Sequence, residues 1–177
     1  MGVIKTMVRR VFVEKKPGFD VEAVNLLADL KENLGIKGIE ELRLFNRYDA
    51  EGLSEGEFER AKTTIFSEPN VDNIYNENLQ MSDEWTCFSV EYLPGQYDQR
   101  ADSAAQCIQL LTQKERPAVA NARVYAFKGQ LSEDNLRQIK KISQNQYMVR
   151  AERIMNPFRL IFIISLFLSG VFCKVLF

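Results

Sequence analysis

The sequence contains no histidine, and its three cysteines, Cys87, Cys107 and Cys173, are far apart with no CxxC pair. Without histidine, zinc sites of the Cys and His type and every mechanism that uses an imidazole as acid or base are excluded. An odd number of scattered cysteines is typical of a reducing compartment rather than of a disulfide framework. We therefore expect a cytoplasmic protein without a histidine-based active site.

Neither sign of charge dominates, because 23 basic residues stand against 24 acidic ones in 177 residues. Nucleic-acid binding draws its affinity from clustered Lys and Arg, and no basic cluster is longer than Arg9–Arg10 or Lys140–Lys141. Phosphate-binding loops of the GxGxxG or GxxxxGK[ST] type are also absent. We expect no nucleic-acid partner and no cofactor in this chain.

Hydrophobic periodicity in the first half predicts a strand, a helix, a strand and a helix. Residues 7–15 alternate like a strand that ends at Pro17 and Gly18, and Asp20 is a candidate N-cap of a helix that ends at Gly35. The further elements are a strand at 42–45, a helix opened by a capping box of Ser54 and Glu57, and a short strand at 71–75.

The same order of elements returns in the second half, with strands at 88–92 and 122–128 and helices at 98–113 and 132–143. Individual residues also recur: Val13, Glu14, Pro17, Gly18, Phe19 and Asp20 return as Val90, Glu91, Pro94, Gly95, Tyr97 and Asp98, and Leu53, Ser54 and Glu55 as Leu131, Ser132 and Glu133. We predict an α+β fold of two ferredoxin-like βαβ units related by an internal pseudo-twofold axis. The halves, residues 7–76 and 86–149, either close against each other or extend into one sheet packed with helices. The alternative is an ordinary alternation of strands and helices without duplication.

The most unusual local sequence, residues 92–102, concentrates turn formers, amides and opposite charges where a strand meets a helix. One interpretation makes Asp98, Arg100 and Asp102 a docking or substrate-contacting set. The other makes Asp98 a helix N-cap and Arg100 a partner of nearby carboxylates on a solvated first turn. The residue types alone leave both open.

Other candidate chemical groups have structural explanations. The acidic clusters at 40–41, 55–59 and 133–134 fall mostly in the first turns of predicted helices, where the macrodipole favours negative charge. We therefore expect no metal site and no catalytic residue. Cys107 lies beside Ile108 and Leu111 in the predicted third helix, so we expect it to be buried as a small hydrophobic residue.

Three stretches, residues 11–23 (VFVEKKPGFDVEA), 44–55 (LFNRYDAEGLSE) and 90–111 (VEYLPGQYDQRADSAAQCIQLL), carry a family likeness. Together they resemble the N-terminal region of the long, single-chain bacterial phosphoribosylformylglycinamidine synthase, over about residues 7–142. This resemblance implies a PurS-like domain spanning residues 1–145, similar to a fused pair of the small PurS subunit of split enzymes. It also implies a place between the synthetase core and the glutaminase domain, where the region helps assemble the path for ammonia.

The complete enzyme is a glutamine amidotransferase and ligase of purine biosynthesis that uses ATP and Mg²⁺. The resemblance carries over no catalytic residue, because the glutaminase uses a Cys, His and Glu set on a separate domain. It implies a noncatalytic assembly domain, inactive alone, whose partners are the synthetase core and the glutaminase domain. We expect the interdomain contacts at Gln96, Asp98, Arg100 and Asp102.

Residues 146–177 depart from the family pattern, and Phe158–Phe177 is a largely apolar run. Only 14 residues separate Arg159 from Lys174, whereas a spanning helix needs about 20. Two explanations stay open: a frameshift or truncated gene model near Asn145, or a real tail anchor. The second makes the chain a membrane-tethered interaction module. Unpaired sheet edges would also allow a homodimer.

Overall fold

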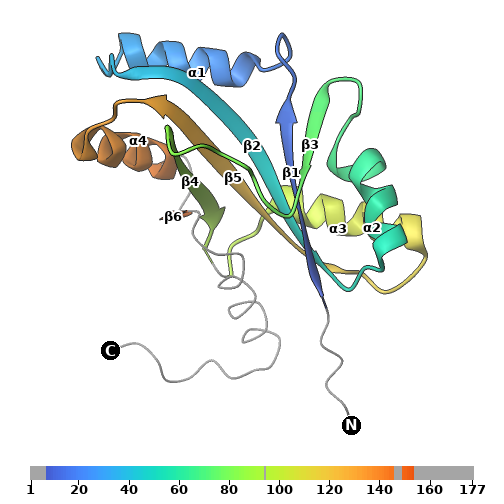
Figure 1. The fold of residues 1–177 in the computed structure, drawn as a ribbon. Coiled ribbons are helices and arrows are strands. Elements are labelled where there is room, and N and C mark those ends of the chain that lie inside the picture. Colours follow the sequence, from blue (N-terminus) through green and yellow to red (C-terminus); the bar gives the residue numbers. More distant parts are fainter. Residues whose placement is uncertain (1–6, 94, 146–148, 154–177) are drawn as a thin grey trace.

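The computed structural model describes residues 7–93, 95–145 and 149–153 as an α+β fold, with helices packed on one antiparallel sheet (Figure 1). The first half of the chain forms β1 (Val8–Lys15), α1 (Val21–Glu32), β2 (Ile39–Glu51), α2 (Glu55–Ala61), the π-helical turn η1 (Lys62–Phe66) and β3 (Asp72–Asn76). The second half forms β4 (Trp85–Tyr92), α3 (Gln99–Thr112), β5 (Ala118–Gly129), α4 (Glu133–Asn145) and β6 (Val149–Arg153).

The sheet has six strands in the order β3-β1-β2-β5-β4-β6, and every neighbouring pair is antiparallel. Its longest pairing joins β2 to β5, from Ile39 opposite Gly129 to Glu51 opposite Ala118. This pairing joins the two halves of the chain, so they extend into one sheet, which is one of the two arrangements expected from the sequence.

Two backbone segments, around Gly38 and Gly129, approach each other closely at one end of the β2–β5 pair. The strand register shifts there, between Ile39 and Glu41. A Cβ atom added to Gly38 would lie 2.1 Å from the carbonyl oxygen of Gln130, and one added to Gly129 would lie 2.2 Å from that of Gly38. Neither position can hold a larger residue without moving the backbone.

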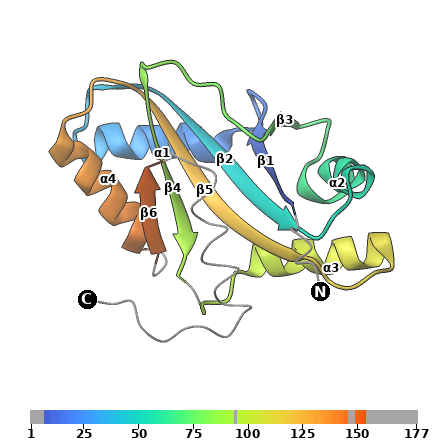
Figure 2. The ribbon, with the colours of Figure 1, turned by 60° about the horizontal axis from the view of Figure 1, so that its bottom comes forward.

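The helices form two pairs at opposite ends of the sheet. Figures 1 and 2 show α1 and α4 toward one end and α2 and α3 toward the other, with the long strands β2 and β5 running between them. Each pair combines a helix from each half of the chain. At one end, Phe58 and Phe66 pack with Ala104 and Ile108 of α3. At the other, Leu30 of α1 joins the cluster of Leu42, Phe88, Phe127 and Ile139.

The opposite face of the sheet has a smaller apolar centre. Phe12, Phe45, Val124 and Ala126 are each at most 1% exposed, and Leu79, Met81 and Trp85 pack against them. Charged residues flank this centre on the same strands. Neighbouring residues of a strand point to opposite faces of the sheet. β2 therefore carries a mainly apolar series on the face covered by helices and a mainly charged series on this opposite face.

Two ion-pair groups make up this flanking charge. Asp49 accepts hydrogen bonds from Arg10, including one of 2.9 Å from Nη2, and lies 3.2 Å from Arg47 Nε. Arg43 donates to both carboxylate oxygens of Glu14 at 2.6 Å. The hydrogen bond to Glu14 raises the pKa of Arg43, against the opposing effect of burial.

Most of the local expectations are confirmed. Ser54 and Glu57 form the predicted capping box, with the Glu57 carboxylate accepting from the Ser54 backbone N–H at 2.9 Å. Asp20 stands at the N-cap position of α1, but its carboxylate accepts from Gly18 N instead of from the helix. The strand predicted at 42–45 is longer than expected, because it continues through the buried ion pairs to Glu51.

The apolar run at 158–177, and with it the choice between a frameshift and a tail anchor, lies outside the described residues. Within the described part of the chain, none of the helices has the length and apolar character needed to cross a membrane.

Candidate functional site

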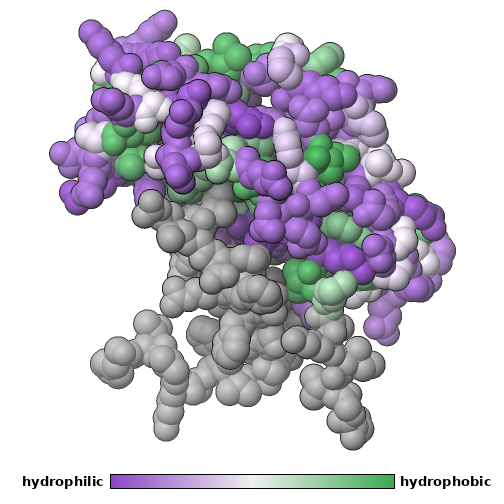
Figure 3. Space-filling model, in the orientation of Figure 1, coloured by the Kyte–Doolittle hydropathy of each residue, from purple (hydrophilic) through white to green (hydrophobic). Residues whose placement is uncertain are grey.

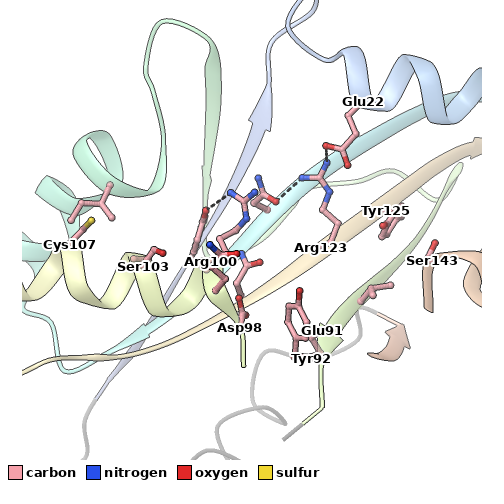
Figure 4. A pocket seen from close by; sticks show the side chains of 17 residues that line it. Glu22, Glu91, Tyr92, Asp98, Arg100, Ser103, Cys107, Arg123, Tyr125 and Ser143 are labelled. Carbon is pink, nitrogen blue, oxygen red and sulfur yellow. Dashed lines mark hydrogen bonds and ion pairs between the residues drawn. The ribbon is translucent and has the colours of Figure 1, made fainter. Parts of the chain in front are cut away.

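A cleft of about 590 Å³ opens between the two helix pairs. Its floor is the middle of the two central strands, with Asn46 and Tyr48 from β2 and Asn121, Arg123 and Tyr125 from β5. The first turns of α3 and α1 border it, as Figure 4 shows. The cleft therefore lies where both halves of the chain contribute to one surface.

Arg100 enters the cleft from the first turn of α3. Asp98 caps this helix, since its Oδ1 accepts from the backbone N–H of Ala101 at 3.0 Å. The Arg100 guanidinium donates to the Tyr48 hydroxyl at 3.3 Å. Burial lowers the pKa of Arg100, but the hydrogen bond to Tyr48 and the nearby charges of Glu22 and Asp98 outweigh it and raise that pKa. Arg100 is thus a fixed positive charge.

Arg123 enters the cleft from β5 and reaches toward α1. Its Nη1 donates to Asn46 Oδ1 at 2.7 Å, and its Nη2 forms an ion pair with Glu22 (Figure 4). The Arg123 side chain is 22% exposed and the Glu22 side chain 73% exposed. Because an exposed ion pair contributes little net free energy, an incoming carboxylate can compete with Glu22 for this guanidinium.

A second cavity of about 630 Å³ adjoins the first. The two share five lining residues: Glu22, Asn46, Tyr48, Arg100 and Arg123. Beyond these, the second cavity is lined by the apolar side chains of Phe19, Val24 and Leu27 and by charged side chains that include Lys15, Glu40 and Glu41. The two cavities together form one groove with a polar centre and an apolar stretch beside α1.

The four residues predicted to make interdomain contacts do not face one site. Asp98 and Arg100 line the cleft. Asp102 instead pairs with Arg116 and accepts from the Tyr97 hydroxyl at 3.1 Å, and the hydrogen bond from Arg116 is the main reason that the pKa of Asp102 is lowered. Gln96 lies in the turn before α3, where its N–H donates to Leu93 O at 3.0 Å.

The structure agrees in part with the structural interpretation of this segment. Asp98 is the N-cap that the structural interpretation expects. Arg100 differs from that interpretation, because its hydrogen-bond partner is the Tyr48 hydroxyl and not a carboxylate. Whether these residues contact other domains stays a prediction.

The expectation that Cys107 is buried is wrong. Cys107 is exposed and lines the cleft, whereas its neighbour Ile108 is 0% exposed and belongs to the core. The buried face of α3 consists of three alanines and Ile108, and Cys107 lies outside this face. Among the described residues, no group of three His, Cys, Asp or Glu side chains is placed to hold a metal ion.

Sequence reasoning missed the floor of the cleft. Asn46, Asn121 and Arg123 are polar residues on the helix-covered face of two central strands, where an apolar residue would be the default. They interrupt the apolar series of β2 and β5 at paired positions, with Asn46 opposite Arg123 and Tyr48 opposite Asn121. The sequence signal that could have revealed this floor is the interruption of the apolar alternation by polar residues in both strands.

The arrangement is suited to recognition. It offers two guanidinium groups, three amide side chains and three tyrosines around one open groove, and guanidinium groups bind carboxylates through paired hydrogen bonds. In comparisons with known proteins, no family model, curated protein or solved structure matches the chain.

Proposed function

We propose that this chain is a noncatalytic assembly domain of phosphoribosylformylglycinamidine synthase, built as a fused pair of PurS-like units. Its partners are the synthetase core and the glutaminase domain of that cytoplasmic ligase, which it organises for ammonia transfer. In this proposal, ATP, Mg²⁺ and all catalytic residues belong to the partner domains.

The observation that carries the proposal is the equivalent strand pairing of the two halves. In the first half β1 pairs with β2 on one side and β3 on the other, and in the second β4 pairs with β5 and β6 in the same way. The two sets meet at the β2–β5 pair, so the order reads the same from either edge. This is the arrangement that a pseudo-twofold axis between β2 and β5 would produce.

Matched turns add support at the level of residues. Gly18 and Gly95 follow β1 and β4 at equivalent points, and their φ angles are +91° and +88°. Ser54 and Ser132 cap the helices that follow β2 and β5, each accepting from a backbone N–H three residues later. These two glycines and two serines therefore have the same structural task in both halves.

The core explains why a fused pair would suit an assembly role. Each helix pair and each large core cluster takes residues from both halves, so the two units are held in one fixed relation. A rigid platform can hold two partner domains at a constant separation, and an ammonia path between active sites requires this.

The experiment that tests the proposal is complementation in trans. The full chain is added to the remainder of a related synthase that lacks this region, and glutamine-dependent amidine formation is measured. Recovered activity, with none from either component alone, is the expected result. A folded chain that neither binds the remainder nor restores activity would refute the assembly role.

A further inference from the structure

We infer that the groove between the helix pairs is the docking site for one extended segment of a partner domain, and that this segment carries an acidic residue and a large apolar residue. The inference rests on the proposed function, since it names the surface and the kind of partner segment that assembly would use.

The acidic residue is required by the charge at the centre of the groove. The carboxylates that line the cleft already have partners within the described structure: Glu22 pairs with Arg123, Glu91 with Arg47, and Asp98 caps α3. In the same part of the chain, Arg100 has no carboxylate within ion-pair distance and bonds the neutral Tyr48 hydroxyl. An incoming carboxylate would give this cation a charged acceptor that can take two parallel N–H···O bonds.

The apolar residue is required by the far end of the groove. Phe19 and Val24 line the second cavity, and each is 56% exposed. Figure 3 shows a mostly hydrophilic surface on which apolar residues form separate groups, one of them at the α1 edge of the fold. An apolar side chain placed against Phe19 and Val24 would remove this surface from water.

The shape and the remaining charges set the direction of the segment. Two adjoining cavities with shared residues form one groove, and an extended chain can occupy both. Glu40 and Glu41 line the second cavity, and its cations Lys15 and Arg43 are already paired with Asp72 and Glu14. A carboxylate there would therefore be repelled. The acidic residue therefore lies over Arg100, and the apolar residue lies against α1.

Calorimetric titration of the full chain with the purified remainder of a related synthase tests the inference. Arg100→Ala should weaken binding about tenfold or more, since hydrogen bonds to charged groups contribute that much. Val24→Asp should weaken it about tenfold by placing a charge on the apolar end. In the nuclear magnetic resonance spectrum, the Arg100 side-chain Nε–H signal should shift when the remainder is added.

Matched controls separate docking from general damage. Arg137→Ala removes an exposed arginine of α4 that lies outside the groove, and Leu110→Asp places a charge on an α3 residue that is 71% exposed. Both variants should bind the remainder like the original chain. Arg100 and Val24 are themselves exposed, so all four variants should keep the same circular dichroism spectrum.

The outcomes distinguish the inference from the function beneath it. If the unaltered chain does not bind the remainder, the proposed function fails. If it binds and the Arg100→Ala and Val24→Asp variants bind equally well, the groove inference is overturned and the assembly role stands. The inference is also overturned if these variants lose self-association of the chain but still bind the remainder. It is overturned as well if inorganic phosphate shifts the Arg100 signal and the remainder does not.

Discussion

The two halves of the molecule share a backbone plan but differ in the surface that each presents after its first strand. β1 and β4 are both eight residues long, and each leads through a turn with a positive-φ glycine into a helix. After the turn, the first half exposes Phe19, Val21 and Val24. The same segment of the second half also exposes one aromatic residue, Tyr97, but carries Arg100 and Asp102 in the first turn of α3.

This difference teaches that a repeated backbone can supply unlike parts of one binding surface. The apolar segment of the first half lines the far end of the groove, and the charged segment of the second half lines its centre. Even the N-caps differ, because Asp98 bonds the helix backbone and Asp20 bonds Gly18. The unlike surface residues, rather than the shared backbone, give the groove its polarity.

The largest expected effect is the loss of folding when the two halves are separated. Each core cluster draws on both halves, so residues 1–80 or 81–177 expressed separately should lack a cooperative thermal transition. Mixing the two pieces should restore it. Near-ultraviolet circular dichroism and thermal melting measure this, and a cooperative transition from either piece alone would contradict the shared core.

The next largest effect concerns a core position of the second half. Phe88 on β4 is 1% exposed and stacks on Tyr125 and Phe127 with ring centroids 5.1 and 5.8 Å apart. Phe88→Ala should lower the free energy of unfolding by about 3–5 kcal/mol, because it removes packing and leaves a cavity. Urea denaturation measures the change. Leu110→Ala, at a position that is 71% exposed, is the control and should change it little.

A smaller effect compares the two serine caps. Ser54→Ala removes the capping box of α2 and should cost about 1 kcal/mol of unfolding free energy. Ser132→Ala removes one bond, of 3.1 Å to Asn135 N, so its cost should be smaller. The two variants can be ranked by urea denaturation under identical conditions. Equal costs would show that the reciprocal Glu57 bond adds nothing.

The smallest effect is a pH dependence that links the halves. The pKa of Glu57 is lowered from 4.5 to about 2, first by the hydrogen bond from Lys114 and then by those from Ser54. A lowered pKa in the folded state means that the stabilisation is present above about pH 4.5 and is lost as pH falls toward 2. Carbon-detected titration of the Glu57 carboxyl measures this pKa. Lys114→Ala should raise it, and an unchanged value would exclude the contact between the halves.

Local elements were predictable because their signals are short-range. The capping box, the glycine turns and the apolar alternation of β1 each depend on residues within a few positions of one another. β2 was predicted too short because Arg47 and Asp49 look like loop residues until Arg10 is placed beside them. β6 was not predicted as a separate strand, and its pairing with β4 depends on a distant part of the chain.

The candidate site was half predictable. Asp98 and Arg100 stood out in the sequence as an unusual turn, and both line the cleft. Arg123 did not stand out because it is one polar residue within the strand predicted at 122–128, and Asn46 did not because it follows the end of the strand predicted at 42–45. Cys107 was misplaced because helical spacing gives the face of a helix only approximately, and one position decides between core and surface.

The sequence by itself determined the order of strands and helices, the turns between them and the recurrence of residues in the two halves, since these depend on local conformational preference and hydrophobic period. The tertiary structure alone decided that the halves join through β2 and β5, and that each helix pair is shared between them. It also decided that Arg100 and Arg123 meet in one groove. Long-range pairing and burial depend on which surfaces exclude water together, and no local pattern contains that information.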